Sequence, residues 1–193
     1  MHLFERSVYC LKAYLMLEDG SVYEGTARGD FKETACEIVF NTSMTGYVEI
    51  LTDPSYAGQG VVMTYPMIGN YGISREDFES ERLQPSAFIV HELSSDPSNF
   101  RCTDTIENLL KEYNIPCISG VDTRAVVKKL RESGTMRGVL TSDIGDRERL
   151  MDVIKSFRQI DLVGSVTAKQ TKVYGEENTG AEIALMDFGT KRN

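Results

Sequence analysis

The chain has 193 residues, of which 41% are hydrophobic and 26% charged, and its formal net charge is −8 at pH 7. This balance is ordinary for a soluble globular protein that buries a core without disulfides or metals. An acidic chain repels phosphate backbones, so we expect no nucleic-acid binding. In the N-terminal stretch MHLFERSVYCLKAYLML, charged Glu5, Arg6 and Lys12 interrupt the apolar residues. This pattern predicts neither a signal peptide nor a membrane span.

The first half of the chain predicts β-structure. Residues 12–25, KAYLMLEDGSVYEG, predict two strands joined at Asp19 and Gly20, because Asp-Gly between apolar runs is typical of a hairpin. The β-branched and aromatic content of CEIVFNTS, QGVVMTYP and SAFIVHEL predicts three further strands. The apolar residues just before Asp53 are interpreted as the end of a strand.

The second half alternates helices and strands. We expect Asp104 to cap a helix over TIENLLKEYN and Asp122 to cap another over TRAVVKKLRESG, with Gly134 ending the second. Strands are predicted in IPCISGV and MRGVLTS, and a helix over 147–157. Together the two halves predict an α/β fold in which one sheet layer packs on another, with helices outside. The residues up to 182 lose the helical period and predict a linker, and EIALMDFG predicts one more strand.

The four cysteines favour no metal site and no disulfide framework. Cys10, Cys36, Cys102 and Cys117 form no Cys-x-x-Cys pair and match no zinc spacing. Cys36 and Cys117 lie in apolar strand contexts, which raise a thiol pKa. Cys102 precedes a helix start, a setting that can lower it. We nevertheless expect all four to be reduced structural thiols.

No catalytic set is visible in the sequence. A nucleophilic serine needs a base within hydrogen-bond reach, and the chain has only His2, near the terminus, and His91, at a strand end. Ser55, in the tight turn Asp53-Pro54-Ser55, has no G-x-S-x-G elbow around it. The glycine-rich stretches do not lead into capped helices, which excludes a phosphate loop. The Asp-Phe-Gly sequence at 187–189 lacks every other kinase motif.

Two polar stretches suit binding better than catalysis. Residues 41–55, NTSMTGYVEILTDPS, concentrate amide, hydroxyl and carboxylate side chains in one predicted loop. Asp122, Thr123 and Arg124 place an acid, a hydroxyl and a guanidinium at a helix start. Arg124 is then either a solvated residue beside a helix cap or an arginine positioned for an interface or an anion, and both interpretations stay open.

Four motifs in order resemble the small subunit of glutamine-dependent carbamoyl-phosphate synthase: FNTSMTGYVEILTDPSYAGQ, TYPMIGNYG, GVDTRAVVKKLRESG and DFGTKRN. The similarity runs from about Lys12 onward. It implies an amino-terminal three-layer β/β/α swivelling-type domain over 12–160, preceded by an extension over 1–11 and followed by a linker over 161–182. Residues 183–193 then resemble the first strand of a class I glutamine amidotransferase domain, of which the chain contains only this beginning.

In this family the second domain hydrolyses glutamine with a cysteine, a histidine and a glutamate. The ammonia passes through a tunnel to the large subunit, which makes carbamoyl phosphate from bicarbonate and ATP with Mg²⁺ for arginine and pyrimidine synthesis. The resemblance therefore implies a cytoplasmic heterodimer with the large subunit as partner and glutamine as substrate. Because this chain holds no Cys-His-Glu set, we expect no catalytic residue, metal or cofactor in it and no activity of the chain alone. The alternatives are a standalone, non-catalytic β/β/α binding domain and, for testing only, a serine hydrolase based on Ser55.

The resemblance also assigns a role to Ser55. In the family, the serine of the Asp-Pro-Ser-Tyr turn reaches the glutamine site, which implies a substrate contact and not a nucleophile. Pro54 presets such a turn, and a hydroxyl can donate to a carboxylate or accept from an amino group without an activating base. Arg124 and the 41–55 stretch are candidate contacts for the large subunit.

Overall fold

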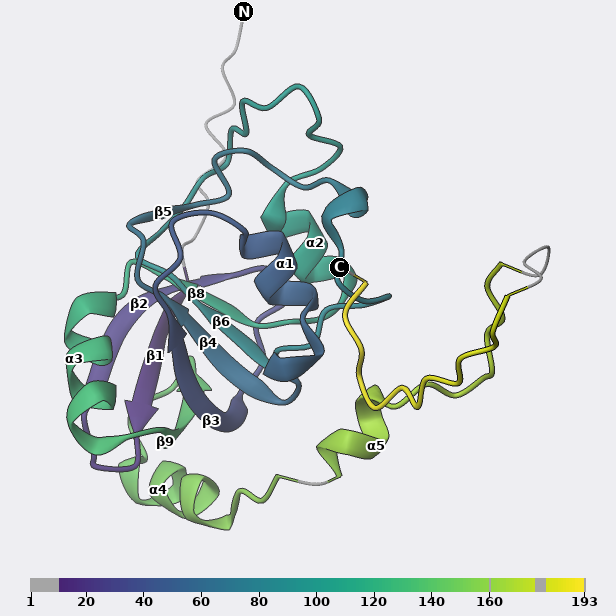
Figure 1. Cartoon of the computed structure of the whole chain (residues 1–193). Coiled ribbons are helices and arrows are strands. Elements are labelled where there is room, and N and C mark those ends of the chain that lie inside the picture. The colour runs from purple at the N-terminus through teal and green to yellow at the C-terminus, as the bar shows by residue number, and fades with distance from the viewer. Residues whose placement is uncertain (1–10, 160, 176–179, 193) are drawn as a thin grey trace, which may run out of the picture.

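Seven strands close into a barrel in the computed structural model, which describes residues 11–159, 161–175 and 180–192 (Figure 1). Around the barrel the strands follow the order β1-β2-β8-β6-β4-β3-β9. Their bounds are Lys12–Leu17 (β1), Val22–Arg28 (β2), Thr34–Asn41 (β3), Gln59–Met63 (β4), Ala87–Ile89 (β6), Cys117–Ser119 (β8) and Met136–Thr141 (β9). The neighbours β3, β4, β6 and β8 are parallel, and the remaining pairs are antiparallel. A parallel two-stranded sheet joins β5 (Met67–Ile68) to β7 (Glu92–Leu93).

This architecture confirms the α/β class but not the three-layer arrangement. Two separate sheet layers would each have free edges, whereas β9 pairs with both β1 and β3 and joins the sheet into a closed ring. The predicted hairpin at Asp19 and Gly20 is confirmed, because β1 and β2 are antiparallel neighbours on either side of it. The strands expected in CEIVFNTS, QGVVMTYP, SAFIVHEL, IPCISGV and MRGVLTS also form, as β3, β4, β6, β8 and β9.

The barrel interior is filled by side chains from alternate strand positions. Leu15, Ile38 and Val62 are fully buried in one apolar cluster inside it. Met16, next to Leu15, points the other way and packs against helix α4 (Arg147–Ser156). Glycine is required where the walls come closest. A Cβ added to Gly138 would lie 2.8 Å from Cγ1 of Ile38 and 3.0 Å from the carbonyl oxygen of Met16.

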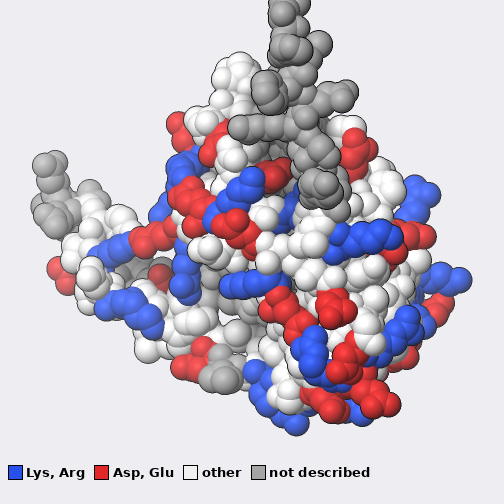
Figure 2. Space-filling model, turned by 180° about the vertical axis from the view of Figure 1, so that it is seen from behind, with Lys and Arg blue, Asp and Glu red and all other residues white. Residues whose placement is uncertain are grey.

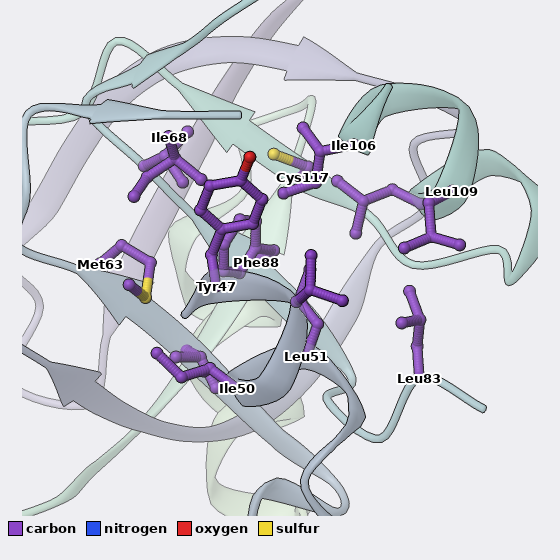
Figure 3. Packing of buried hydrophobic residues seen from close by; sticks show 14 of the residues in the cluster. Tyr47, Ile50, Leu51, Met63, Ile68, Leu83, Phe88, Ile106, Leu109 and Cys117 are labelled. Carbon is purple, nitrogen blue, oxygen red and sulfur yellow. The ribbon is translucent and has the colours of Figure 1, made fainter. Parts of the chain in front are cut away.

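Four of the described helices pack around the barrel, and the fifth, which has no buried residue, lies in the C-terminal segment (Figure 1). They are α1 (Tyr47–Thr52), α2 (Ile106–Glu112), α3 (Thr123–Ser133), α4 (Arg147–Ser156) and α5 (Leu162–Val166), with short 3₁₀ turns at Pro54–Tyr56 (η1) and Arg75–Asp77 (η2). Figure 3 shows α1 and α2 contributing Tyr47, Leu51 and Leu109 to a cluster with Phe88 of β6 and Cys117 of β8. Burial of such large apolar side chains, at about 1.5–3 kcal/mol each, holds α1 firmly on the sheet.

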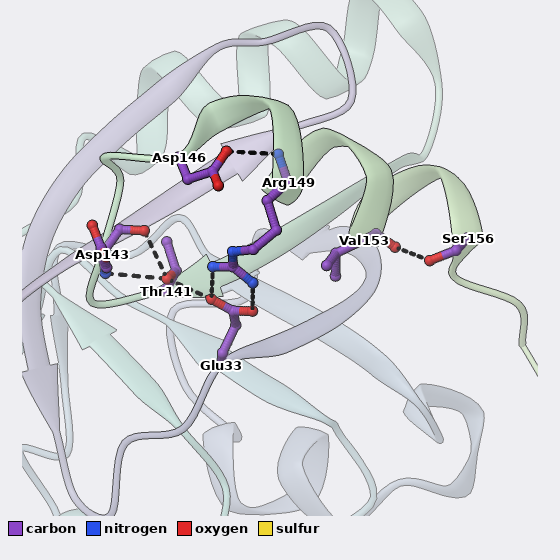
Figure 4. A network of polar contacts seen from close by, with 7 residues as sticks. All are labelled: Glu33, Thr141, Asp143, Asp146, Arg149, Val153 and Ser156. Carbon is purple, nitrogen blue, oxygen red and sulfur yellow. Dashed lines mark hydrogen bonds and ion pairs between the residues drawn. The ribbon is translucent and has the colours of Figure 1, made fainter.

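A polar network fixes α4 to the chain segment that precedes β3 (Figure 4). Arg149 of α4 donates to both carboxylate oxygens of Glu33, at 2.7 and 2.8 Å, and the Thr141 hydroxyl donates to the same carboxylate. The hydrogen bond from Arg149 contributes most to lowering the pKa of Glu33. A two-pronged pair of this kind adds orientation to the apolar packing beneath it.

Two expectations about the residues that form or cap helices α1 and α2 were wrong. The residues before Asp53 form helix α1 and not a strand end. A short apolar run does not distinguish the two by periodicity, and here Gly46, at φ 80°, turns the chain into a helix. Helix α2 is capped by Thr105, which accepts from the amide of Asn108, while Asp104 accepts from the Thr105 amide and the Asn108 side chain. The Asp122 cap of α3 is confirmed by its bond from the Ala125 amide.

The strand expected over EIALMDFG does not form, since the described residues 180–192 contain no strand. A strand needs a neighbour for its backbone groups, and no strand lies beside this segment. Within the expected linker, 162–166 form α5. The domain boundaries, including the extension over 1–11, stay predictions. Residues 1–10, with His2 and Cys10, and residue Asn193 lie outside the described residues.

The thiols of Cys36 and Cys117 are buried, and burial raises the pKa of each to about 12. Cys102 is half-buried, and its thiol lies 3.3 Å from the carbonyl oxygen of Asp104. The three described cysteines are free thiols, as expected, and their structural role stays a prediction. Acidic and basic side chains are interspersed on the face seen in Figure 2, so the net negative charge does not form one continuous field there. None of the described helices is long and apolar enough to cross a membrane.

Candidate functional site

The turn Asp53-Pro54-Ser55 leaves the C-terminal end of α1 and begins η1. The Asp53 carboxylate accepts a hydrogen bond from the Ser55 amide at 2.8 Å, and Pro54 occupies the first position of the 3₁₀ turn. Asp53 and Pro54 are buried, whereas Ser55 is exposed. The local sequence therefore holds a serine at the surface on a turn that side-chain bonding and proline both constrain.

The other end of α1 is anchored by two tyrosines. The Tyr47 and Tyr71 rings stack with their centroids 4.1 Å apart. The Tyr71 hydroxyl accepts from the amides of Gly46 and Tyr47, and the Tyr47 hydroxyl donates to the carbonyl of Gly72. Because α1 is fixed at its start and packed along its length, the turn at its end has a defined position.

The C-terminal segment returns to this turn (Figure 1). Nζ of Lys191 lies 2.6 Å from Oδ2 of Asp53, and the amide of Arg192 donates to the carbonyl of Glu79 at 3.0 Å. Gly189, at φ 109°, packs so closely that an added Cβ would lie 3.3 Å from Cβ of Pro54. The segment is itself folded, because the Asp187 carboxylate accepts from the amides of Gly189 and Thr190. Two sequence motifs far apart in the chain thus meet at one place.

Electrostatics make Asp53 the centre of this contact. Burial acts to raise the pKa of Asp53, but hydrogen bonds from Lys191 and Ser55 outweigh it and hold the pKa below its ordinary value. In return, the hydrogen bond to Asp53 raises the pKa of Lys191. The Asp53 side chain is 12% exposed and that of Lys191 is 47% exposed, so the pair is partly shielded from water. One carboxylate therefore fixes both the Ser55 turn and the incoming segment.

Further contacts support the docked segment, by which we mean 161–175 and 180–192. Arg82 donates to the carbonyl of Ser165 at 3.0 Å, and Lys172 pairs with Glu81 at 2.9 Å. The segment nevertheless carries apolar side chains in water: Val173, Tyr174, Ile183, Leu185, Met186 and Phe188 are 58–91% exposed. Such a set is typical of a surface that another structure covers.

A family model described as "Carbamoyl-phosphate synthase small chain, CPSase domain" matches residues 15–140. The chain belongs to this family. The carbamoyl phosphate synthase small chain of Caldanaerobacter subterraneus subsp. tengcongensis is 47% identical over 182 residues, 94% of this chain and 49% of the relative. The small chain of Clostridium perfringens is 47% identical over 184 residues, which are 95% of this chain and 52% of the relative. The small chain of Archaeoglobus fulgidus is 48% identical over 186 residues, which are 94% of this chain and 51% of the relative. The chain spans about half the length of the curated relatives it matches, and the resemblance predicted from its motifs is confirmed.

The 41–55 stretch of this small-chain family member is divided between several environments. Asn41 donates to the Tyr56 hydroxyl at 2.9 Å, next to the turn. The Thr52 hydroxyl is buried and serves backbone groups of α1 and of Glu79. Thr42 lies instead in a groove beside α3. The expected single polar loop is therefore not one site, and Ser55 with Asp53 forms the part of it that meets the second motif.

Arg124 and His91 lie in other surroundings. Arg124 is exposed on α3 and lines the same groove as Thr42. Nδ1 of His91 is 3.1 Å from the carbonyl oxygen of Val121, which makes His91 a hydrogen-bonded structural residue. The residue that sequence reasoning missed is Lys191. It stands in a motif, DFGTKRN, that was used for the resemblance, but no local signal shows that it pairs with Asp53.

Proposed function

We propose that this chain is the amino-terminal part of the small subunit of glutamine-dependent carbamoyl-phosphate synthase and that Ser55 contacts glutamine. The observation that carries the proposal is the ion pair between Asp53 and Lys191. It joins the turn of the first domain to the motif that, by resemblance, opens the amidotransferase domain. Ser55 would then be a residue of the first domain that contacts the substrate bound by the amidotransferase domain.

The chemistry of the proposed contact needs no activated serine. The Ser55 hydroxyl would bond to the charged α-amino or α-carboxylate group of glutamine, as donor or acceptor. Asp53 and Lys191 would act as positioning residues that hold the turn. Bond breaking in glutamine would fall to a cysteine, a histidine and a glutamate of the remaining amidotransferase domain.

The exposed apolar side chains of the docked segment support the proposal that another structure covers them. Ile183, Leu185, Met186 and Phe188 are exposed and lie in or next to the continuous apolar run 183–186, in a segment that has no strand partner among the described residues. We propose that 183–188 form a strand once the sheet of the amidotransferase domain is present. Both faces of a parallel strand are covered in such domains, which would bury these side chains.

The proposed assembly extends to the large subunit. Ammonia released from glutamine would pass to it, and it would use bicarbonate and ATP with Mg²⁺ to form carbamoyl phosphate. We propose a cytoplasmic heterodimer that serves arginine or pyrimidine synthesis. The names of the relatives support the enzyme class, ligase with glutamine amidotransfer.

The three-layer swivelling description belongs to the same proposal. We propose that opposite walls of the barrel act as two sheet layers, with α1 and α2 as the helical layer outside the wall that carries Phe88 and Cys117. Helix, wall and wall would then correspond to the three layers expected from the resemblance. In this proposal β9 joins the edges of the two sheet layers by pairing with both β1 and β3, and the layers themselves remain.

The decisive experiment restores the full small subunit, pairs it with the large subunit and compares wild type with Ser55→Ala. Loss of a hydrogen bond to a charged group costs about 1.5–3 kcal/mol, which corresponds to roughly 10- to 150-fold in kcat/KM for glutamine. We expect the loss mainly in KM, and ammonia-dependent synthesis to be nearly unchanged. A collapse of kcat by many orders of magnitude would make Ser55 catalytic. Unchanged kcat and KM would reduce Asp53-Pro54-Ser55 to a structural turn.

A further inference from the structure

We infer that a basic groove beside α3 docks an acidic surface of the partner protein, an inference that rests on the proposed function for the existence of that partner. The α3 groove has a volume of about 650 Å³ and is lined by Thr42, Thr64, Arg124, Val127, Lys128, Arg131 and Glu132. Thr42 and Thr64 directly follow the carboxyl ends of the parallel neighbours β3 and β4. Hydroxyl groups from the barrel and cations from the helix therefore face the same space.

The three cations of the groove have no anionic partner within the described part of the chain. Arg124, Lys128 and Arg131 are all exposed, and none forms an ion pair with a described residue. The next residue along the helix behaves differently, because Lys129 pairs with Asp19 at 2.9 Å. Glu132 also lines the groove, so the lining carries three cations and one carboxylate, an excess of positive charge in a chain whose formal net charge is −8.

Helix stability does not explain this arrangement. Arg124 and Lys128 are four residues apart, and like charges at that spacing repel each other on a helix surface. Arg124 also lies in the first turn of α3, where the helix dipole disfavours a cation. Both effects oppose folding slightly. Glu132, four residues after Lys128, offsets part of the charge, but no described residue forms an ion pair with Arg124 or Arg131. An anionic group from outside the chain would satisfy these charges.

The geometry favours a protein surface over a small anion. From Arg124 to Arg131 the cations extend about 10 Å along the helix, at about 1.5 Å per residue. Sites for small molecules are mostly apolar, enclosed and preformed. Here Val127 is the one apolar lining residue, and the cations are carried on long exposed side chains. A row of such cations matches a row of carboxylates on a partner and would steer its approach.

The test measures association of the full small subunit with the large subunit by stopped flow at several salt concentrations. We expect Arg124→Glu to slow association several-fold at low salt, and Arg124→Glu combined with Lys128→Glu to slow it roughly ten-fold or more. The differences should shrink as salt rises. Arg147→Glu is the matched control, because Arg147 is also an exposed arginine in the first turn of a helix, α4, and also lacks a described ion pair. We expect it to stay within two-fold of wild type.

Thermal unfolding of each variant verifies that the fold is intact, and Arg124→Glu should not lower Tm because it replaces a cation at a helix start. Equal slowing by Arg124→Glu and Arg147→Glu would overturn the inference, since it would show an effect of total charge alone. Stabilisation of the wild type, but not of Arg124→Glu, by millimolar inorganic phosphate, with association unchanged, would also overturn it in favour of a small-anion site. Absence of any complex with wild-type protein would instead contradict the proposed function.

Discussion

Replacing Asp53 by asparagine tests whether one carboxylate fixes the docked segment. The Asp53→Asn side chain keeps its shape and can still accept from the Ser55 amide, but it loses the charge that holds Lys191 at 2.6 Å. A hydrogen bond to a charged group contributes about 1.5–3 kcal/mol. Because Lys191 is 47% exposed, water screens part of this, and we expect a loss of about 1 kcal/mol.

The assay is amide hydrogen exchange, which reports local opening. The amides of Gly189, Thr190 and Arg192 all donate within or from the docked segment. A loss of about 1 kcal/mol corresponds to roughly five-fold faster exchange there, at about 1.4 kcal/mol per ten-fold. Amides of the paired strands β1 and β9 should exchange as in wild type. Glu81→Gln is the matched control, since its pair with Lys172 joins two more exposed side chains and should matter less.

The same contact predicts a pH dependence. The folded-state pKa of Asp53 is below its ordinary value, so the pair stabilises the docked segment above the unfolded pKa of about 4. This stabilisation is lost as pH falls from there through the folded pKa. After correction for intrinsic exchange rates, protection of the Arg192 amide should fall further over this range in wild type than in Asp53→Asn. The Gly189 and Thr190 amides are less informative, because the Asp187 carboxylate that accepts from them also has a lowered pKa and titrates in both proteins. Equal protection in both proteins at neutral pH, or exchange that accelerates equally in the barrel, would refute the reasoning.

Two further predictions concern the absence of a catalytic set and the barrel interior. The purified chain alone should release no ammonia from glutamine above a buffer control, because its sequence holds no Cys-His-Glu set. Burial also raises the pKa of the Cys36 and Cys117 thiols to about 12. Ammonia release by this chain would contradict the prediction. Gly138→Ala should lower the free energy of unfolding by about 1–3 kcal/mol in urea, because the new Cβ would crowd Ile38 and the Met16 carbonyl. An unchanged urea midpoint of unfolding would show that the strands around Gly138 shift to accept the new Cβ without loss of stability.

Local signals in the sequence predicted much of the barrel. The Asp19-Gly20 turn, the Asp122 cap and the apolar strand runs each depend on neighbouring residues, and each formed as expected. Barrel closure could not be predicted in this way. It depends on β9 pairing with β1 and β3, which lie far from it in the sequence, and pairing partners leave no local pattern. Helix α1 was missed because residues 47–52 are almost continuously buried and show no helical periodicity.

The candidate site was predictable only in part, for a related reason. The turn at Ser55 carries its own signals, an acid that can accept from the backbone and a proline that fixes φ. Lys191 carries none, because a lysine in a polar C-terminal motif is usually a solvated side chain. Its role arises only when the chain returns to α1, and the resemblance to a family pointed to the motif without indicating its contact.

Asp53 holds two parts of the site at once. Its carboxylate accepts from the Ser55 amide through Oδ1 and pairs with Lys191 through Oδ2, so the turn and the docked segment share one anchor. If Lys191 moves, Asp53 remains partly buried with a weaker set of donors, and the constraint on Ser55 weakens with it. The position of the proposed glutamine contact would therefore depend on the position of the docked segment. A serine that belongs to one domain and serves the substrate of another needs such a connection, because otherwise each movement between the domains would displace it from its ligand.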